Sequence, residues 1–397
     1  MMMQQDGHTH RAKTISYNWI IVFCFVFGSL VINLDTPNQI FLWVIIPLLF
    51  VYCMLLYGNI LLKNKYIAIY IVILLWSLAT CLIASDMFLA LMQLRIMLST
   101  FVLSIIFYSL SQNKRYLPWL YLTFLLIVLA NYYYVRNNIL TDMVIGLERA
   151  NDEKFNANEL SYFLFYAICA VFVFGEIFTD DKRKLSRIFL FAFIAIIPYF
   201  ALITMSRQIF VIVIPFCLFS IIYRYNPFSS IKRLVVYGVL LAIFIFIIYY
   251  YYLPLYEASI FVDRLSRDVT EDSRFALIVG GFLLGFQNPL LGVGPGNVLL
   301  YLNGSFTHSS YAELFAASGL FPLVLFISLI AKFILEQWRR YRQTNDKLFM
   351  YFFMTGIFWA AYNWFYVFYS SFWLMCFLFL LIGHSNQRYK ESKVKGV

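Results

Sequence analysis

The sequence of 397 residues has little charge: 13% of its residues are Asp, Glu, Lys or Arg, whereas 62% are hydrophobic. Ordinary soluble domains carry about 25% charged residues, so this composition excludes a soluble globular protein and is typical of a polytopic membrane protein. The apolar runs also lack the alternation of a barrel strand. Because backbone groups in lipid must be satisfied within their own segment, we predict an all-α fold.

Cysteine and clustered carboxylates are scarce as well. All six cysteines fall inside apolar runs, which argues against an external disulfide framework or a cysteine metal site. A divalent cation needs several carboxylates or a DxD pair, and "NDE" at 151–153 and "TED" at 270–272 are poor substitutes. We therefore predict neither a metal nor another cofactor.

Apolar runs of about 17 to 25 residues, long enough to cross a hydrocarbon core of roughly 30 Å, occur about twelve times. They lie near residues 17–34, 39–62, 66–85, 87–110, 116–135, 159–178, 188–206, 208–223, 234–253, 309–331, 348–365 and 366–383. The first run follows a polar start and lacks a small-residue cleavage site, so we interpret it as a retained span.

The predicted organisation has five parts. Residues 1–135 form spans one to five, 136–158 an external loop, 159–253 spans six to nine, 254–308 a large external loop, and 309–397 spans ten to twelve with a tail.

Basic residues are distributed unevenly over this topology. With the N-terminus inside, the inner segments hold most of the 30 lysines and arginines, including "KRKLSR", "WRRYR" and the Lys-rich tail. The positive-inside rule therefore places both termini in the cytoplasm. This placement argues for a lipid bilayer as the partner of the basic residues and against nucleic acid.

A water-exposed site on the outer face must use the two long external segments and the short turns beside them. The external cations are Arg136, Arg149, Lys154, Arg207, Arg264, Arg267 and Arg274. Arg207 lies in a turn between two apolar runs, where positive charge is disfavoured, so it is either an anion clamp or a side chain reaching the headgroups. Arg274 can bind a phosphate bidentately or pair weakly with a neighbouring acid. Arg264 and Arg267 have acidic neighbours and fit a solvated loop.

Two further residues and one segment are unusual for their positions. Arg95 lies about eight residues inside the fourth span, where a charge is costly and usually faces a cavity or a partner such as Glu159 or a carbonyl. His308 immediately precedes the tenth span, and histidine can accept a proton near neutral pH. The stretch "FALIVGGFLLGF" at 275–286 is too short to span and rich in glycine, which predicts an interfacial or re-entrant piece.

These residues carry a resemblance to a known family. "NPLLGVGPGNV", followed by "HSSYAELFAASGLFPLVLF", resembles the signature region of bacterial O-antigen ligases and polymerases, in which a Gly-Val-Gly loop leads to a His-Ser or His-Asn pair and a later glycine. His308, Ser309 and Gly319 fit that spacing. "TMSRQ" at 204–208 resembles the family's Ser-Arg pair, and "FNANELSYFL" its Asn-Pro-Asn entry to a span, with Ala157 in place of proline.

The resemblance implies a GT-C-like integral membrane glycosyltransferase that works without a metal on the periplasmic face of the bacterial inner membrane. It would transfer a glycan from undecaprenyl diphosphate to an acceptor hydroxyl, on a glycan or on the lipid A core. His308 would be the base, and Arg207 and Arg274, with Arg95 as a further candidate, would bind the diphosphate. Gly292, Gly294 and Gly296 would let backbone approach the ligand. The helix that begins near Ser309 would direct its N-terminal dipole toward the same anion.

Other functions stay open at this point. The His308-Ser309 pair with Gly319 favours a ligase, whereas Arg274 with Gly285 fits a pattern of some polymerases, and Pro322 departs from the ligase pattern. A protein O-oligosaccharyltransferase of the same superfamily commonly carries extra C-terminal sequence. A lipid-linked glycan flippase usually shows internal repeats, and we find no convincing repeat in this chain.

Overall fold

A computed structural model describes residues 40–138, 157–177, 196–225 except 198, 202 and 205, 229–250 except 248, and 273–394 except 368. The first predicted span, most of the seventh and most of the external loop 136–158 lie outside the described residues. So do residues 254–272 of the large loop, including Arg264 and Arg267.

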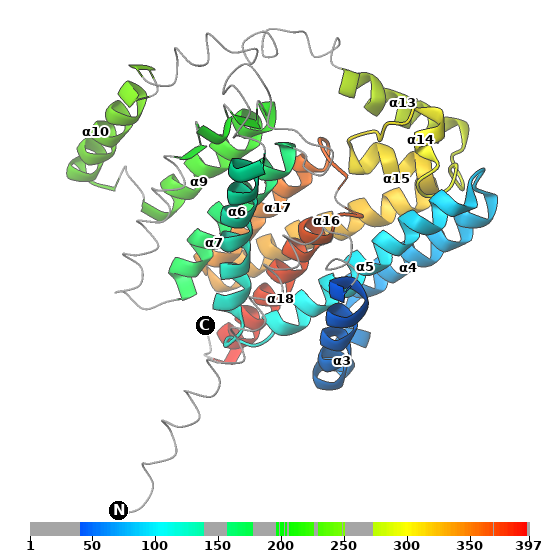
Figure 1. The fold of residues 1–397 in the computed structure, drawn as a ribbon. Helices are drawn as coiled ribbons and strands as arrows, with labels where there is room; N and C mark the ends of the chain where they lie inside the picture. Colours follow the sequence, from blue (N-terminus) through cyan, green and yellow to red (C-terminus); the bar gives the residue numbers. More distant parts are fainter. Residues whose placement is uncertain are drawn as a thin grey trace, which may run out of the picture. The chain divides into compact units, whose positions relative to one another are not determined.

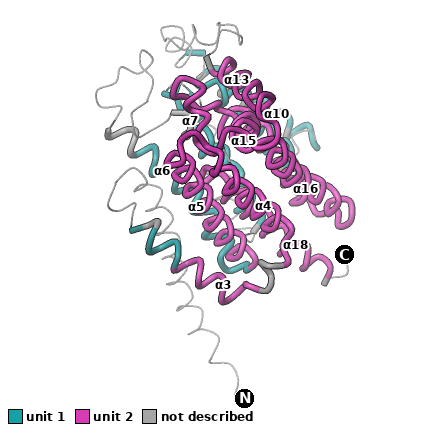
Figure 2. Tube along the Cα trace, turned by 90° about the vertical axis from the view of Figure 1, so that its right-hand side faces the viewer, with its two compact units in different colours: residues 1–47, 113–262 teal, residues 48–112, 263–397 magenta. Residues whose placement is uncertain are grey.

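The chain divides into two compact units, coloured separately in Figure 2. Unit 1 comprises residues 1–47 and 113–262, and unit 2 comprises residues 48–112 and 263–397. The described residues are helical and contain no strand, in agreement with the predicted all-α fold (Figure 1). In unit 1 the helices are η1 (Phe41–Ile45), α6 (Leu117–Asn138), α7 (Ala157–Ile177), η3 (Ile209–Val213), α9 (Ile214–Tyr225) and α10 (Ile231–Ile247).

Unit 2 holds most of α3 (Ile46–Leu62) and the remaining elements. These are α4 (Lys65–Thr80), η2 (Cys81–Ile83), α5 (Met87–Ser111), α13 (Ser273–Gln287), α14 (Val298–Tyr301), α15 (Ser310–Ser318), α16 (Leu320–Thr344), α17 (Lys347–Tyr362) and α18 (Phe372–Val394).

Side-chain caps define where several unit 2 helices begin. Asn64 accepts the Tyr66 N–H at 2.8 Å at the start of α4. Asp86 and Asp346 cap α5 and α17 in the same way. Each cap satisfies N–H groups that have no partner inside the helix. The short polar breaks between the apolar runs therefore determine the hairpin connections of this unit.

Two π-helical turns precede prolines in long apolar segments. The turn η1 ends two residues before Pro47, and η3 ends two residues before Pro215. A proline ring clashes with the carbonyl four residues earlier and donates no hydrogen bond. A widened turn at that place accommodates the proline, which is why each segment continues as a helix.

Three helices among the described residues are long and apolar enough to cross a membrane: Lys65–Ile83, Met87–Ser111 and Leu320–Thr344. Shorter apolar helices occupy parts of five more predicted spans or segments. Large hydrophobic side chains are exposed along these helices, for example Leu75, Leu98 and Val324. Monomeric soluble proteins rarely expose so much contiguous apolar surface. The helices therefore fit a membrane environment, while the number of twelve spans stays a prediction.

The tenth predicted span is wrong as a single helix. Residues 309–331 divide into α15 and α16 at Gly319, which has φ 85° and ψ −173°. At this glycine an added Cβ would lie 2.3 Å from the Leu290 carbonyl oxygen, so the break is also a close contact. The helix α16 then continues to Thr344, well beyond the predicted end of the span.

The glycine-rich stretch 275–286 is helical, and the expectation of an interfacial or re-entrant piece stays a prediction. It forms the regular helix α13, which packs against α15. Added Cβ atoms at Gly281 and Gly285 would lie 2.4 Å from the side chains of Thr307 and Phe315, respectively. Glycine lowers helix stability by about 1 kcal/mol relative to alanine, but here it allows two helices to approach closely.

Close packing also joins the N- and C-terminal parts of unit 2. The helices α5 and α18 form an extensive contact, and Gly383 lies directly against Ser111 and the Tyr108 carbonyl. Gln112 donates to the Gly383 carbonyl at 3.1 Å. In unit 1, α6 packs on α7, and Phe165 of α7 contacts Phe216 of α9. Small residues at such contacts are typical of membrane helices.

Candidate functional site

His308 lies in the loop between α14 and α15, in a backbone conformation that histidine rarely adopts. Its φ is 56°, and its side chain is half-buried between the buried Thr307 and Ser309. A left-handed conformation costs a residue other than glycine roughly 1–2 kcal/mol. Such strain persists only where the surrounding structure enforces it, and it concentrates at functional sites.

Hydrogen bonds on both sides of His308 hold this conformation. The Thr307 hydroxyl donates to the Ser309 carbonyl at 3.0 Å, and the Ser309 N–H approaches the same hydroxyl at 3.3 Å. The Thr307 N–H donates to Glu313 Oε2 at 3.0 Å. The backbone around His308 is thus fixed by buried groups while the imidazole itself remains partly accessible.

Glu313 forms a contact with the His308 loop that the sequence did not predict. It lies in the first turn of α15, is 2% exposed, and belongs to a nine-residue helix outside the three candidate spans. Burial raises the pKa of its carboxyl, and the hydrogen bonds from Thr307 oppose that rise. The position of Glu313 four residues after Ser309 was a possible signal, because acidic residues near a helix start often bond backward.

The start of α15 is anchored to the connection between α17 and α18. The Ser310 N–H donates to the carbonyls of Asn363 at 2.8 Å and Tyr366 at 3.1 Å. The Ser309 hydroxyl also reaches the Asn363 carbonyl at 3.3 Å. The Ser310 N–H is therefore used within the protein, because two carbonyl oxygens accept from it, and the direction of the helix dipole toward an anion stays a prediction.

Asn363 brings a second feature that the sequence did not reveal. Its side-chain amide donates to the Trp359 carbonyl at 2.8 Å, while its Oδ1 atom is buried and has no hydrogen-bond partner among the described residues. A buried acceptor without a donor is costly. The Oδ1 atom therefore offers a hydrogen-bond acceptor beside the His308 loop.

The glycines of the loop 292–296 contact the protein's own backbone and are buried. Gly292, Gly294 and Gly296 all have positive φ, as the loop requires. Added Cβ atoms would lie 2.4 Å from the Ala317 carbonyl carbon, 2.5 Å from the Ala84 side chain and 2.8 Å from the Leu89 carbonyl oxygen, respectively. These close approaches are used for packing within the protein, and an approach of a ligand to the same loop stays a prediction.

Backbone and side-chain hydrogen bonds connect this loop to its surroundings. The Val293 and Gly294 N–H groups donate to the carbonyls of Ala316 and Ala317 at the end of α15. The side chain of Asn297 forms two hydrogen bonds with the backbone of Asp86. It accepts the Asp86 N–H at 2.7 Å and donates to the Asp86 carbonyl at 2.8 Å. The loop therefore positions α15, and with it His308, relative to the start of α5.

Arg274 shares unit 2 with His308. It is the second residue of α13 and is half-buried. Seven residues later on the same helix, Gly281 lies against Thr307, the neighbour of His308. At a rise of about 1.5 Å per residue, Arg274 lies roughly 10 Å along the helix axis from that contact.

Arg95 has no interior partner among the described residues of unit 2, and its pairing with Glu159 of unit 1 stays a prediction. Its side chain is exposed, and among the described residues no hydrogen bond or ion pair involves its guanidinium. It shares a face of α5 with the exposed apolar residues Phe88, Leu91, Met92 and Leu98, which follow helical spacing. A long side chain on such a face can extend toward the headgroups.

Arg207 belongs to unit 1, where it is half-buried at the start of the segment leading into η3. Its neighbour Gln208 accepts a hydrogen bond from Ser161 on α7 at 3.3 Å. A site shared by Arg207 and His308 would join the two units and stays a prediction. The described residues contain no group of three or more His, Cys, Asp or Glu side chains that could hold a metal ion.

Comparison of the chain with protein-family models and with curated proteins gives no match. The resemblance to the O-antigen ligases and polymerases therefore rests on the residues quoted for it.

Proposed function

We propose that the chain is an integral membrane glycosyltransferase of the O-antigen ligase type, acting on the periplasmic face of the bacterial inner membrane. The observation that carries the proposal is the His308 loop, in which a half-buried histidine is held at φ 56° by buried neighbours. An accessible general base in an enforced conformation fits a role in proton transfer.

In the proposed reaction the hydroxyl of the acceptor attacks the anomeric carbon of the donor glycan. The new bond joins the acceptor oxygen to that carbon, and the bond from the carbon to the phosphate oxygen breaks. Undecaprenyl diphosphate leaves with the electron pair, and the imidazole of His308 takes the hydroxyl proton. A single displacement of this kind inverts the anomeric configuration.

Arginines would stabilise the negative charge that develops on the leaving diphosphate. Arg274 is the candidate in the same unit as His308, and Arg207 is the candidate in unit 1. Arg95 lies on an apolar face of α5, where a donor with a polyprenyl chain can arrive through the outer leaflet. In this proposal Arg95 captures the diphosphate, and Arg274 and Arg207 hold it during transfer.

A polymerase would use the same chemistry with a growing glycan as acceptor. The arginine-to-glycine pattern that suggested this alternative has a structural explanation at its second residue. Gly285 is the site where Phe315 packs against α13, so a small residue is required there whatever the acceptor is. We therefore favour the ligase, with the lipid A core as acceptor.

The proposal predicts that His308→Ala lowers transfer by about 10² or more, the usual scale for loss of a general base. The assay uses purified protein in liposomes with a lipid-linked donor and either a lipid A core acceptor or a second donor glycan. Arg339→Ala is the control, because Arg339 is an exposed residue of α16 outside the proposed site.

Two results would contradict this proposal. One is near-wild-type transfer by folded His308→Ala protein. The other is a product that retains the donor's anomeric configuration, which would require a covalent intermediate and a nucleophile such as Glu313. Product formed only with the second donor glycan would instead identify a polymerase.

A further inference from the structure

Unit 2 contains a cavity of about 500 Å³ that the proposed reaction does not use. Its walls come from the α3–α4 connection, the last turns of α5, the second half of α16 and the second half of α18. On the predicted topology these segments lie on the cytoplasmic side. Its volume is within the range of about 300–1,000 Å³ that is typical of ligand sites.

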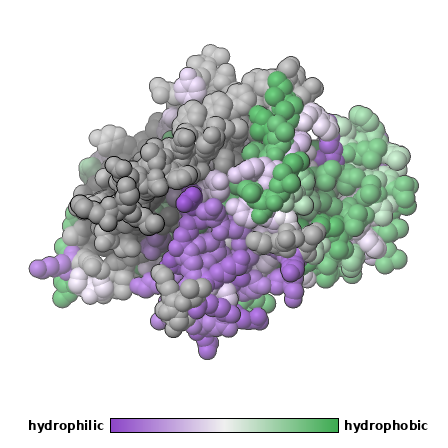
Figure 3. Space-filling model, turned by 90° about the horizontal axis from the view of Figure 1, so that it is seen from below, coloured by the Kyte–Doolittle hydropathy of each residue, from purple (hydrophilic) through white to green (hydrophobic). Residues whose placement is uncertain are grey.

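The charge of the lining is strongly positive. Its cationic residues are Lys63, Lys65, Lys332, Arg340 and Lys390, and its one carboxylate is Glu336, for a formal charge of +4. Figure 3, which views the molecule from below, shows hydrophilic residues gathered in a patch beside apolar surface. Like charges brought together from separate segments repel one another, and a bound anion relieves that repulsion.

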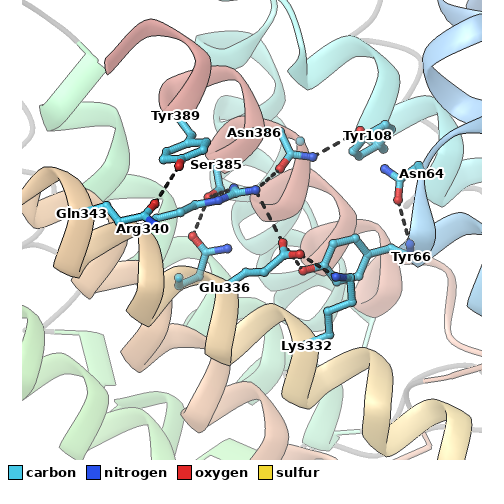
Figure 4. Close-up of polar contacts among 12 residues, drawn as sticks. Asn64, Tyr66, Tyr108, Lys332, Glu336, Arg340, Gln343, Ser385, Asn386 and Tyr389 are labelled. Carbon is cyan, nitrogen blue, oxygen red and sulfur yellow. Dashed lines mark hydrogen bonds and ion pairs between the residues drawn. The ribbon is translucent and has the colours of Figure 1, made fainter. Parts of the chain in front are cut away.

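One part of this lining is held in an internal network of hydrogen bonds and ion pairs, as Figure 4 shows. The guanidinium of Arg340 donates to Ser385 at 2.6 Å and to Asn386 at 2.5 Å, and it lies 3.5 Å from Glu336. Glu336 also accepts from Lys332 and from the Tyr66 hydroxyl, each at 2.6 Å. This network uses the single carboxylate of the cavity to balance the two cations of α16.

The three remaining lysines are differently placed. Lys63, Lys65 and Lys390 are exposed, and none of them has a hydrogen bond or ion pair with the part of the chain that the structure describes. Asn64 and Asn386 also line the cavity. Three ammonium groups without an ion pair, in a lining that is positively charged as a whole, have the chemistry that a compact multivalent anion requires.

We propose that this cavity binds a phosphate group, carried either by an anionic phospholipid of the adjacent leaflet or by a soluble phosphate. Lysine ammonium groups are point charges that bind phosphate oxygens without a fixed orientation. A basic cavity between membrane helices at the headgroup level is suited to a lipid phosphate. Binding here would join four segments of unit 2 and stabilise it, independently of the transfer reaction.

The test measures ligand-dependent thermal stability of the purified full-length protein in detergent. Phosphatidylglycerol, phosphatidylethanolamine and inorganic phosphate are titrated separately, and the unfolding midpoint is followed. The cavity variant carries Lys63→Gln, Lys65→Gln and Lys390→Gln. The matched control carries Arg339→Gln, Arg342→Gln and Lys347→Gln, which remove the same charge from exposed residues that do not line the cavity.

We expect a saturable rise of the midpoint in the wild type, and an affinity about 10²-fold weaker in the cavity variant, since each lysine near the surface contributes about 1 kcal/mol. The control should stay close to the wild type. Saturation by phosphatidylglycerol alone identifies a lipid headgroup, and saturation by inorganic phosphate identifies a soluble ligand. Equal weakening in both triple variants, or no saturable rise with any of the three probes, would overturn the proposal.

Discussion

Glu313→Ala is the substitution that tests how the His308 loop is held. Glu313 is 2% exposed and accepts the buried Thr307 N–H at 3.0 Å. Removing the carboxylate leaves that N–H without its acceptor, at a cost of about 1–3 kcal/mol. The left-handed conformation of His308 holds roughly 1–2 kcal/mol of strain, which favours relaxation once the bond is lost. If the 1–3 kcal/mol of the lost hydrogen bond appears in the barrier, transfer slows about 5- to 150-fold.

The assay compares initial transfer rates at saturating donor and acceptor in liposomes. We expect kcat to fall and KM to change little, because Glu313 is buried and its bond acts on the loop backbone. A thermal unfolding midpoint verifies that the variant is folded. The matched variant is Glu313→Gln, whose amide oxygen can still accept the Thr307 N–H and should retain most of the rate.

Two results would refute this reasoning. A full rate in Glu313→Ala would show that the bond to Thr307 does not hold His308. A Glu313→Gln variant as slow as Glu313→Ala would show that the carboxyl contributes its charge or its proton to the reaction rather than its position.

Two further substitutions test the diphosphate clamp and the glycine loop. Arg207→Ala should lose most transfer activity and Arg207→Lys should keep only a fraction, because an ammonium does not reproduce bidentate phosphate binding. Equal activity of the lysine variant and the wild type would indicate simple charge anchoring. The control substitution Arg264→Ala should reduce transfer much less. Gly292→Ala should lower the unfolding midpoint more than Gly304→Ala does. Both glycines have positive φ, but an added Cβ lies 2.4 Å from backbone at Gly292 and meets nothing within 4 Å at Gly304. Equal shifts would show that strain alone, about 1–2 kcal/mol, accounts for both.

Local sequence determined the helical elements and many of their ends. The length of an apolar run and the polar break after it are properties of neighbouring residues, so the helices α4, α5 and α17 lie close to their predicted spans. Caps such as Asn64 and Asp86 act within three residues of their own position. The position of His308 next to a helix start could also be predicted, because it depends on neighbouring residues.

The packing role of the glycine-rich segments could not be predicted, because local sequence does not show what a glycine contacts. A glycine with positive φ can lie against a ligand or against the protein itself. The structure shows that Gly292 packs against the backbone of Ala317 and Gly296 against that of Leu89. The helix α13 forms despite its glycines because α15 fills the space that they leave.

Charged residues show the same division between sequence and tertiary structure. The sequence by itself determined that Arg95 lies within an apolar run and that basic residues gather in the inner segments. Only the tertiary structure decided that Arg95 is exposed on an apolar face of α5, that Glu313 bonds back to Thr307, and that four distant segments line one open basic cavity. The physical reason is that helix formation depends on residues a few positions apart, whereas burial and charge pairing depend on which helices the folded chain brings together.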